Sequence, residues 1–226
     1  ELREADERAK LLDYVLGVLI LENDAAQATC QHLRDFYQAP GVELRFIVAE
    51  FYARRYPEQT DLFAVPRALP NSRTVTIGVK SLYFWAHVAL QVEARSSIKT
   101  DPDAVVNLPL LKRITSVMDA RSTGPPLLYA GDINWNKFDT SRMNGYCWAM
   151  QPLRSLHLKG CQKAPGDFAP FATGSLAVLS AALAQRASTT IASLGWLQER
   201  PWSLSSYWED RLLGRVVAHD ERPVNL

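Results

Sequence analysis

The chain lacks several features that would assign it to a specialised class of protein. It has only three cysteines in 226 residues, so it is not a disulfide-rich scaffold, and their spacing fits no zinc finger. Its longest apolar run, Tyr14 to Leu21, is shorter than the ~20 residues that span a bilayer. Lys and Arg number 25 against 24 Asp and Glu, so no overall charge attracts nucleic acid or anionic lipid. We therefore expect no nucleic-acid partner and no membrane anchor within the chain.

The sequence also lacks common nucleotide-binding and glycosylation motifs, and these absences say less about the function. The sequence contains no Gly-x-Gly-x-x-Gly and no Gly-Lys-Ser loop, which argues against an unrelated nucleotide-binding protein on a doubly wound sheet. It contains no Asn-x-Ser/Thr acceptor, which neither supports nor removes a secretory location. The cysteines allow two interpretations: a Cys147–Cys161 disulfide with Cys30 as a free thiol, or three buried free thiols.

Short apolar runs alternate with helical segments along the first half of the chain. Strands are expected at 14–21, 42–48, 61–65 and 97–100, and helices at 24–38, 75–92 and from 107 onward. This alternation predicts an α/β fold with a largely parallel sheet covered by helices on both faces. Ligands of such sheets bind beyond the carboxyl ends of the strands.

Periodicity and capping residues give finer expectations for three helices. Asn23 or Asp24 is expected to cap the first helix, and Asn107 the one that has Pro109 in its first turn. The predicted buried stripes are Val75, Val79, Leu82, Tyr83, Ala86 and Leu90 in one helix, and Leu110, Ile114, Val117 and Met118 in the other.

The texture of the sequence changes after Gly124. Strands are expected at 127–130 and 175–179, and helices at 181–194 and 208–217. Between them, 134–167 is rich in Asn, Trp, Gly, Lys and Pro and has weak periodicity, which indicates an irregular, partly antiparallel region.

The segment Lys99-Thr-Asp-Pro-Asp103 stands where a short strand should end. Two carboxylates one residue apart converge on one cation if the backbone turns there, and Mg²⁺ and Mn²⁺ prefer oxygen ligands together with phosphate oxygens. Pro102 favours an extended conformation at Asp101, as at the exit from a strand. Taken alone, the same pattern is more often a solvated Asx turn or a helix-capping acid.

Glu209 and Asp210 precede an apolar helical segment. One of them could act as a general base that takes a proton from an attacking hydroxyl. Acids in the first turn of a helix are also favoured by its dipole, so ordinary capping is the alternative.

Two further candidates are a glycine and a histidine. Gly174, followed by Ser175 and close to Phe171, would let backbone approach a sugar whose ring packs on the aromatic side chain, although a plain turn explains the pattern equally well. His219 is of interest as a third ligand to a metal held by two carboxylates, whereas a lone histidine is more often solvated.

In order and spacing these motifs resemble glycosyltransferase family 31, which includes β-1,3-galactosyl- and N-acetylglucosaminyltransferases. Lys99–Asn107 is similar to the family's Lys-Thr-Asp-Asp-Asp followed by Val/Ala-Phe-Val-Asn. Phe171–Ser180 is similar to its Tyr-x-Ser-Gly-Gly-Gly-Tyr-Val-Leu-Ser, and Glu209–Gly214 to its Glu-Asp-Val-x-x-Gly. Leu33–Tyr37 and Ile77–Ser81 match its Ile-Arg-x-Thr-Trp and Leu-Thr-x-Lys-Thr in part.

The resemblance implies a GT-A-like, Rossmann-type fold and an inverting transfer of a hexose from a UDP-sugar to a glycan hydroxyl. Galactose is the expected hexose and β-1,3 the expected linkage. It implies a leading stem or helix at 1–12 and one catalytic domain at 13–226, with a nucleotide-sugar half at 13–123 and an acceptor half at 124–226. It also implies a type II membrane protein of the Golgi lumen, whose anchor lies outside this chain.

Site residues carry over from the resemblance position by position. Mn²⁺ or Mg²⁺ would be held by Asp103, Asp101 and His219. Asp210 would be the base, with Glu209 as the fallback. The UDP-sugar donor would lie near Asp101, Arg34, Lys80, Gly174 and Ser175.

The sequence departs from the family at identifiable positions. Pro102 replaces the middle Asp, Gly174 is the one glycine left of three, and Thr29-Cys30 stand where the family has paired arginines. These departures suggest a distant branch. They also keep open the alternative of a non-catalytic glycan-binding or chaperone-like relative.

Overall fold

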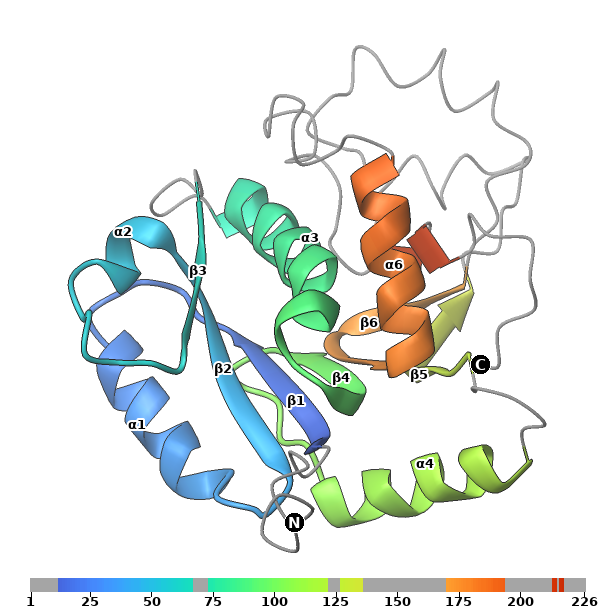
Figure 1. The fold of residues 1–226 in the computed structure, drawn as a ribbon. Coiled ribbons are helices and arrows are strands. Elements are labelled where there is room, and N and C mark those ends of the chain that lie inside the picture. The colour runs from blue at the N-terminus through green and yellow to red at the C-terminus, as the bar shows by residue number, and fades with distance from the viewer. Residues whose placement is uncertain are drawn as a thin grey trace, which may run out of the picture.

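The fold is built on a six-stranded sheet in the order β3-β2-β1-β4-β6-β5 (Figure 1). The computed structural model describes residues 12–66, 73–121, 127–135 and 170–193, with 213, 214, 216 and 217. The strands are β1 (Leu12–Leu19), β2 (Val42–Ala49), β3 (Leu62–Val65), β4 (Ala94–Thr100), β5 (Tyr129–Trp135) and β6 (Pro170–Ser180). The helices are α1 (Ala26–Phe36), α2 (Glu50–Ala53), α3 (Arg73–Gln91), α4 (Leu108–Arg121) and α6 (Ala181–Ser193).

The sheet is mostly parallel, as predicted. Strand β1 pairs in parallel with both β2 and β4, and β2 pairs in parallel with β3. Strand β6 runs antiparallel between β4 and β5. The predicted α/β class is therefore confirmed, with a mixed sheet in which one strand is reversed.

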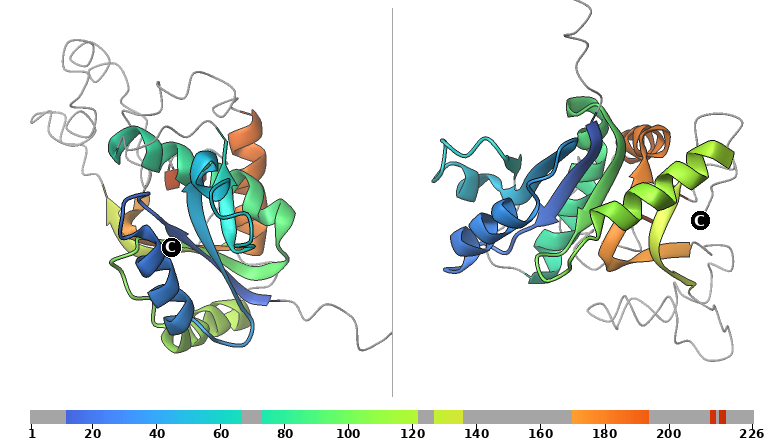
Figure 2. Two further views of the ribbon diagram at one scale, coloured as in Figure 1. Left: turned by 90° about the vertical axis from the view of Figure 1, so that its left-hand side faces the viewer. Right: turned by 90° about the horizontal axis from the view of Figure 1, so that it is seen from below.

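Helices cover both faces of the sheet (Figure 2). On one face, Leu16 and Val18 of β1 belong to the core cluster that includes residues of α1 and α4. On the other, Val15 and Leu19 belong to the cluster formed with α3 and α6. Because successive side chains of a strand point to opposite faces, a strand buried on both sides reads as one apolar run. That is why the run beginning at Tyr14 predicted β1 correctly.

The expected strands and helices of the described segments are all present, and their ends differ mainly in the second half. Strand β6 begins at Pro170, five residues before the expected start, and β5 continues to Trp135. The predicted cap of α4 is confirmed, because the Asn107 side chain accepts the amide of Leu110 at 3.0 Å. The predicted cap of α1 by Asn23 or Asp24 is wrong: the helix is capped at Ala25 without a side-chain hydrogen bond, and the Asn23 side chain accepts the amide of Ala25 at 3.1 Å in the turn before the helix.

The predicted buried stripe of α4 is wrong by about one residue of rotation. Leu110, Ile114 and Val117 are exposed, whereas Leu111 and Thr115 face the sheet. Hydrogen bonds of Thr115 explain this rotation. The Thr115 hydroxyl bonds to the Tyr14 hydroxyl at 2.9 Å and donates to the Leu111 carbonyl at 3.1 Å. The side chain of Met118, the fourth predicted member, lies outside the described part.

The predicted stripe of α3 is right in its middle and wrong at its end. Val79, Leu82 and Ala86 are buried and Tyr83 is partly buried, but Leu90 is exposed. Phe84, Trp85 and Val88, which the stripe left out, are also buried. Because α3 packs both on the sheet and on α6, it buries more than one face, and its buried residues no longer follow a single helical stripe.

Cys30 is a free, fully buried thiol, and burial raises its pKa to about 11. Cys147 and Cys161 lie outside the described residues, as does nearly all of the irregular region expected at 134–167, so the choice between the two cysteine interpretations stays open there. Among the described residues, no helix combines the length and apolar character needed to cross a bilayer.

Gly17 in β1 gives a first prediction about packing. A Cβ there would lie 2.5 and 2.7 Å from atoms of the Phe84 ring and 3.0 Å from Ile47. We expect Gly17→Ala to lower the free energy of unfolding by about 1–3 kcal/mol, because the buried ring must shift. Urea unfolding measures the change. Ser116→Ala on the exposed side of α4 is the control, expected within about 0.5 kcal/mol of wild type; equal effects of the two changes would contradict the close packing.

Candidate functional site

The candidate site lies at the carboxyl ends of β1 and β4. From β1 the chain moves outward through β2 to β3, then returns through α3 to place β4 on the other side of β1 (Figure 1). In open α/β sheets, ligands bind at such a reversal, in the crevice between the loops that leave the two strands. The two loops begin at Ile20 and Asp101.

The Asp-x-Asp segment forms a tight turn directly after β4. The amide of Ala104 donates to the Asp101 carbonyl at 3.2 Å, which reverses the chain over Pro102 and Asp103. Asp101 is partly buried and Asp103 is exposed. The backbone therefore forms an ordinary turn, as the structural interpretation of the motif expects. The turn directly follows β4, which is where the metal-binding interpretation requires the two aspartates.

Strand β6 brings a second predicted motif to the same place. Thr100 is paired with Leu176 across the antiparallel ladder, and its hydroxyl donates to the Ser175 carbonyl at 2.8 Å. Gly174 and Ser175 therefore lie beside the start of the Asp101 turn, although more than 70 residues separate them in sequence. Two of the predicted motifs are brought together in this way.

A buried lysine lies beneath the turn. The Lys99 ammonium donates to the Asp101 carboxylate at 2.9 Å, and the two side chains are 3% and 32% exposed. The lysine side chain is thus buried, and the aspartate side chain is about one-third exposed. Lys99 belongs to the motif that carries the family resemblance, but the resemblance assigned no role to its charge.

The end of β1 carries a second buried ion pair. Lys80 of α3 donates to the Ile20 carbonyl at 2.8 Å and forms a close ion pair with Glu22, whose carboxylate also accepts the amide of Ala49 at 2.7 Å. Burial lowers the pKa of Lys80, and the charge and hydrogen bond of Glu22 oppose that shift. The pair joins α3 to the carboxyl ends of β1 and β2. The charge of Lys80, which the resemblance implies should lie near the nucleotide, is therefore already paired within the protein.

Glu22 was missed by sequence reasoning. The available signal was its position, an acidic residue directly after a buried apolar run and before a helix cap. Its partner could not have been identified, because Lys80 is 58 residues away in the chain.

Arg34 lies away from this crevice. Its guanidinium binds both carboxylate oxygens of Asp61, at 2.6 and 3.0 Å, and the Gln59 side chain at 2.8 Å. The hydrogen bond that Arg34 donates to Asp61 raises the pKa of Arg34. Asp61 immediately precedes β3, which β2 and β1 separate from β4. The structure therefore does not bring Arg34 together with Asp101.

Glu209, Asp210 and His219 lie outside the described residues. Nearby, Leu213, Gly214, Val216 and Val217 are helical, in agreement with the helix expected at 208–217. Leu213 and Val217 are buried in the core cluster shared with α3 and α6. These described residues therefore pack on that face of the sheet.

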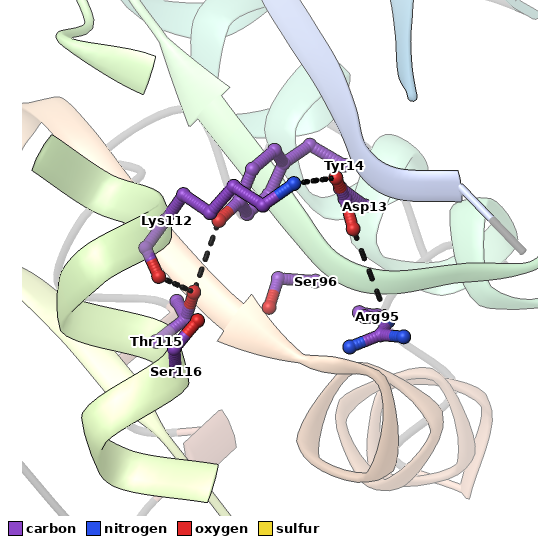
Figure 3. A pocket seen from close by; sticks show the side chains of 7 residues that line it. All are labelled: Asp13, Tyr14, Arg95, Ser96, Lys112, Thr115 and Ser116. Atoms are coloured by element: carbon purple, nitrogen blue, oxygen red, sulfur yellow. Dashed lines mark hydrogen bonds and ion pairs between the residues drawn. The ribbon is translucent and has the colours of Figure 1, made fainter. Parts of the chain in front are cut away.

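A small polar hollow at the opposite edge of the sheet is a contrast to this site (Figure 3). There Asp13 binds Lys112 of α4 at 2.6 Å and lies 3.9 Å from Arg95, next to the bond between Tyr14 and Thr115. These contacts attach α4 to the amino ends of β1 and β4. Since ligands of parallel strands bind at the carboxyl edge, we assign the hollow a structural role.

Comparison with models of known protein families and with curated proteins finds no match to the chain.

The Lys80–Glu22 pair gives a prediction about stability. Both side chains are almost fully enclosed, at 2% and 4% exposure, so removing one charge leaves the other buried without a partner. We expect Lys80→Met to lower the free energy of unfolding by about 3–5 kcal/mol, and a double change with Glu22→Gln to recover part of the loss. Urea unfolding of the two variants measures both effects.

Lys112→Met is the matched control, because it breaks a Lys–Asp pair whose lysine is 62% exposed. We expect it to cost less than about 1 kcal/mol, since solvent screens such pairs. If Lys80→Met cost no more than Lys112→Met, the pair at the end of β1 would not be a buried structural contact.

Proposed function

We propose that the chain is the catalytic domain of an inverting, metal-dependent glycosyltransferase with a GT-A-like fold, which transfers a hexose from a UDP-sugar to a glycan hydroxyl. The observation that carries the proposal is the Asp101–Asp103 turn at the β1/β4 switch point, with Gly174 and Ser175 beside it. A mostly parallel sheet with helices on both faces is the frame that a GT-A fold uses, so the architecture supports the proposal at that level.

The carboxylates of the turn have the chemistry to hold a divalent ion. Mg²⁺ is commonly bound by one or two carboxylates together with phosphates of the substrate, so Asp103 and Asp101 suffice without a larger protein cage. Among the described residues, no group of three or more acidic, histidine or cysteine side chains that could hold a metal ion occurs. His219 is the proposed third protein ligand. When bound, Mn²⁺ or Mg²⁺ would neutralise charge on the departing UDP.

The remaining roles follow from the resemblance together with this placement. Asp210 would take the proton from the acceptor hydroxyl while its oxygen attacks the anomeric carbon from the face opposite UDP, which inverts the configuration. Glu209 is the alternative base. Gly174 and Ser175 would border the sugar.

The two cationic residues proposed for the nucleotide have narrower roles. The charges of Lys80 and Arg34 are already paired with Glu22 and Asp61. They enter the proposal as supports of the fold around the crevice, and Lys80 is the closer of the two because it binds the end of β1.

The donor, acceptor and location are proposed from the resemblance alone. Galactose is the proposed hexose, a β-1,3 linkage the proposed product, and the Golgi lumen the proposed location, with an anchor outside this chain. The second candidate is a glycan-binding relative without activity. It is favoured by the Lys99–Asp101 ion pair, since a carboxylate held by an ammonium is less available to a metal ion.

Calorimetry with Mn²⁺ and UDP tests the metal site. We expect Mn²⁺-dependent UDP binding that weakens by at least about tenfold in Asp103→Ala, because a ligand of the metal is lost. The control is Asp35→Ala, which removes an equally exposed carboxylate near the end of α1. UDP binding that needs no metal, or that falls equally in both variants, would argue against the site.

A screen of UDP-sugars for hydrolysis or transfer then separates an enzyme from a binding protein. We expect activity with one donor that is lost in Asp210→Asn while UDP binding persists. Binding without turnover of any donor would favour the second candidate, and full activity of Asp210→Asn would remove Asp210 as the base.

A further inference from the structure

Strand β6 contains a wide bulge beside the Asp101 turn. The pairs of the β5–β6 ladder on either side of the bulge are Gly131–Ala177 and Ile133–Ala172. Residues 173–176 of β6 therefore lie opposite a single residue of β5 and have no partner of their own in that ladder. Bulges disrupt a ladder locally, bend the strand and are frequent next to active sites. This bulge contains Gly174 and Ser175, the two residues proposed to border the donor sugar.

Gly131 lets β5 approach the bulge closely. A Cβ at this position would lie 2.4 Å from the carbonyl oxygen of Leu176, the last residue of the bulge, and 2.6 Å from the Cβ of Ala172, which precedes the bulge. Its φ of +157° is also one that residues with a side chain rarely adopt. Because the closest contact is with backbone, no side-chain rotation relieves it. A side chain at position 131 therefore displaces the bulge.

Thr100 holds the other side of the bulge against the Asp101 turn. It pairs with Leu176 in the β4–β6 ladder, and its hydroxyl donates to the Ser175 carbonyl at 2.8 Å. The same hydroxyl lies 3.4 Å from the Asp101 carbonyl. Thr100 is fully buried, whereas Ser175 is exposed. The bulge is thus fixed from within the sheet by residues of two neighbouring strands.

We infer that Gly131 is a positioning residue for the donor sugar, because it fixes the bulge that carries Gly174 and Ser175. This inference rests on the proposed function, and it adds a residue that none of the family motifs in the sequence includes. Gly131 acts through the bulge: it sets the place of the bulge from the side of β5, as Thr100 does from the side of β4. A displaced bulge changes the contacts with the hexose and leaves the metal ligands of the Asp101 turn in place.

Calorimetry at saturating Mn²⁺ with two probes, UDP-galactose and UDP, tests this role. In Gly131→Ala we expect UDP-galactose to bind about tenfold more weakly and UDP to bind within about twofold of wild type, because only the sugar contacts the displaced bulge. Circular dichroism at the same temperature verifies that the variant is folded. An equal loss of both affinities would mean that Gly131 only maintains the sheet, and the inference would be wrong.

The matched control is Gly17→Ala, which crowds another glycine of the same sheet, but against the Phe84 ring of α3. It lowers the stability and should leave both affinities unchanged. If it weakened UDP-galactose binding as much as Gly131→Ala does, crowding anywhere in the sheet would explain the loss, and the role of Gly131 would be disproved.

Two variants of Thr100 give a second test from the other side of the bulge. Thr100→Val removes the hydroxyl that holds Ser175 and should weaken UDP-galactose binding about tenfold without weakening UDP binding. Thr100→Ser keeps the hydroxyl and should bind both probes as wild type does. If Gly131→Ala fails to fold, this pair decides alone, and equal binding by the two variants overturns the inference.

The outcomes also separate the inference from the proposed function. Unchanged UDP-galactose binding in a folded Gly131→Ala overturns the inference and leaves the proposed function intact. A wild-type protein without Mn²⁺-dependent UDP binding overturns both.

Discussion

The parallel pairing of β1 with β2 on one side and β4 on the other is the constraint on which the rest of the structure depends. Parallel strands end at the same edge, so the residues that follow them meet although they are far apart in sequence. Glu22 follows β1 and Asp101 follows β4. A sheet with these two strands antiparallel would send the same residues to opposite ends, and no crevice between their loops would form.

At that edge, two buried lysines on neighbouring elements each form an ion pair with a carboxylate. A carboxylate beside an apolar core loses hydration, and a buried ammonium restores much of the lost stabilisation. Lys80 does this for Glu22 and Lys99 for Asp101. The pairs differ in exposure: both side chains of the first are almost fully buried, whereas the Asp101 side chain of the second is about one-third exposed.

The sequence predicted those features that local patterns determine. Apolar runs located β1 and β2, and Asn107 marked the start of α4 because a cap requires only residues within one turn. The buried face of α4 was missed, because the bond between Thr115 and Tyr14 spans 101 residues. The structural pairing of Arg34 with Asp61 and of Lys80 with Glu22 was missed for the same reason: a charge pattern does not identify a partner that the fold supplies.

The direction of β6 determines which residues of the second half of the chain lie beside the Asp101 turn. Because β6 is antiparallel to β4, its early residues, not its last, lie at the carboxyl edge, so Gly174 and Ser175 border the Asp101 turn and the chain leaves β6 at the opposite edge. Helix α6 then runs back over the sheet, and Leu213 and Val217 pack on the same face. Leu213 and Val217 are thus held by apolar burial, whereas the Asp101 turn follows a strand that is paired on both sides. The metal-binding part of the proposed mechanism therefore depends on the sheet, and it can be tested separately from the proposed base.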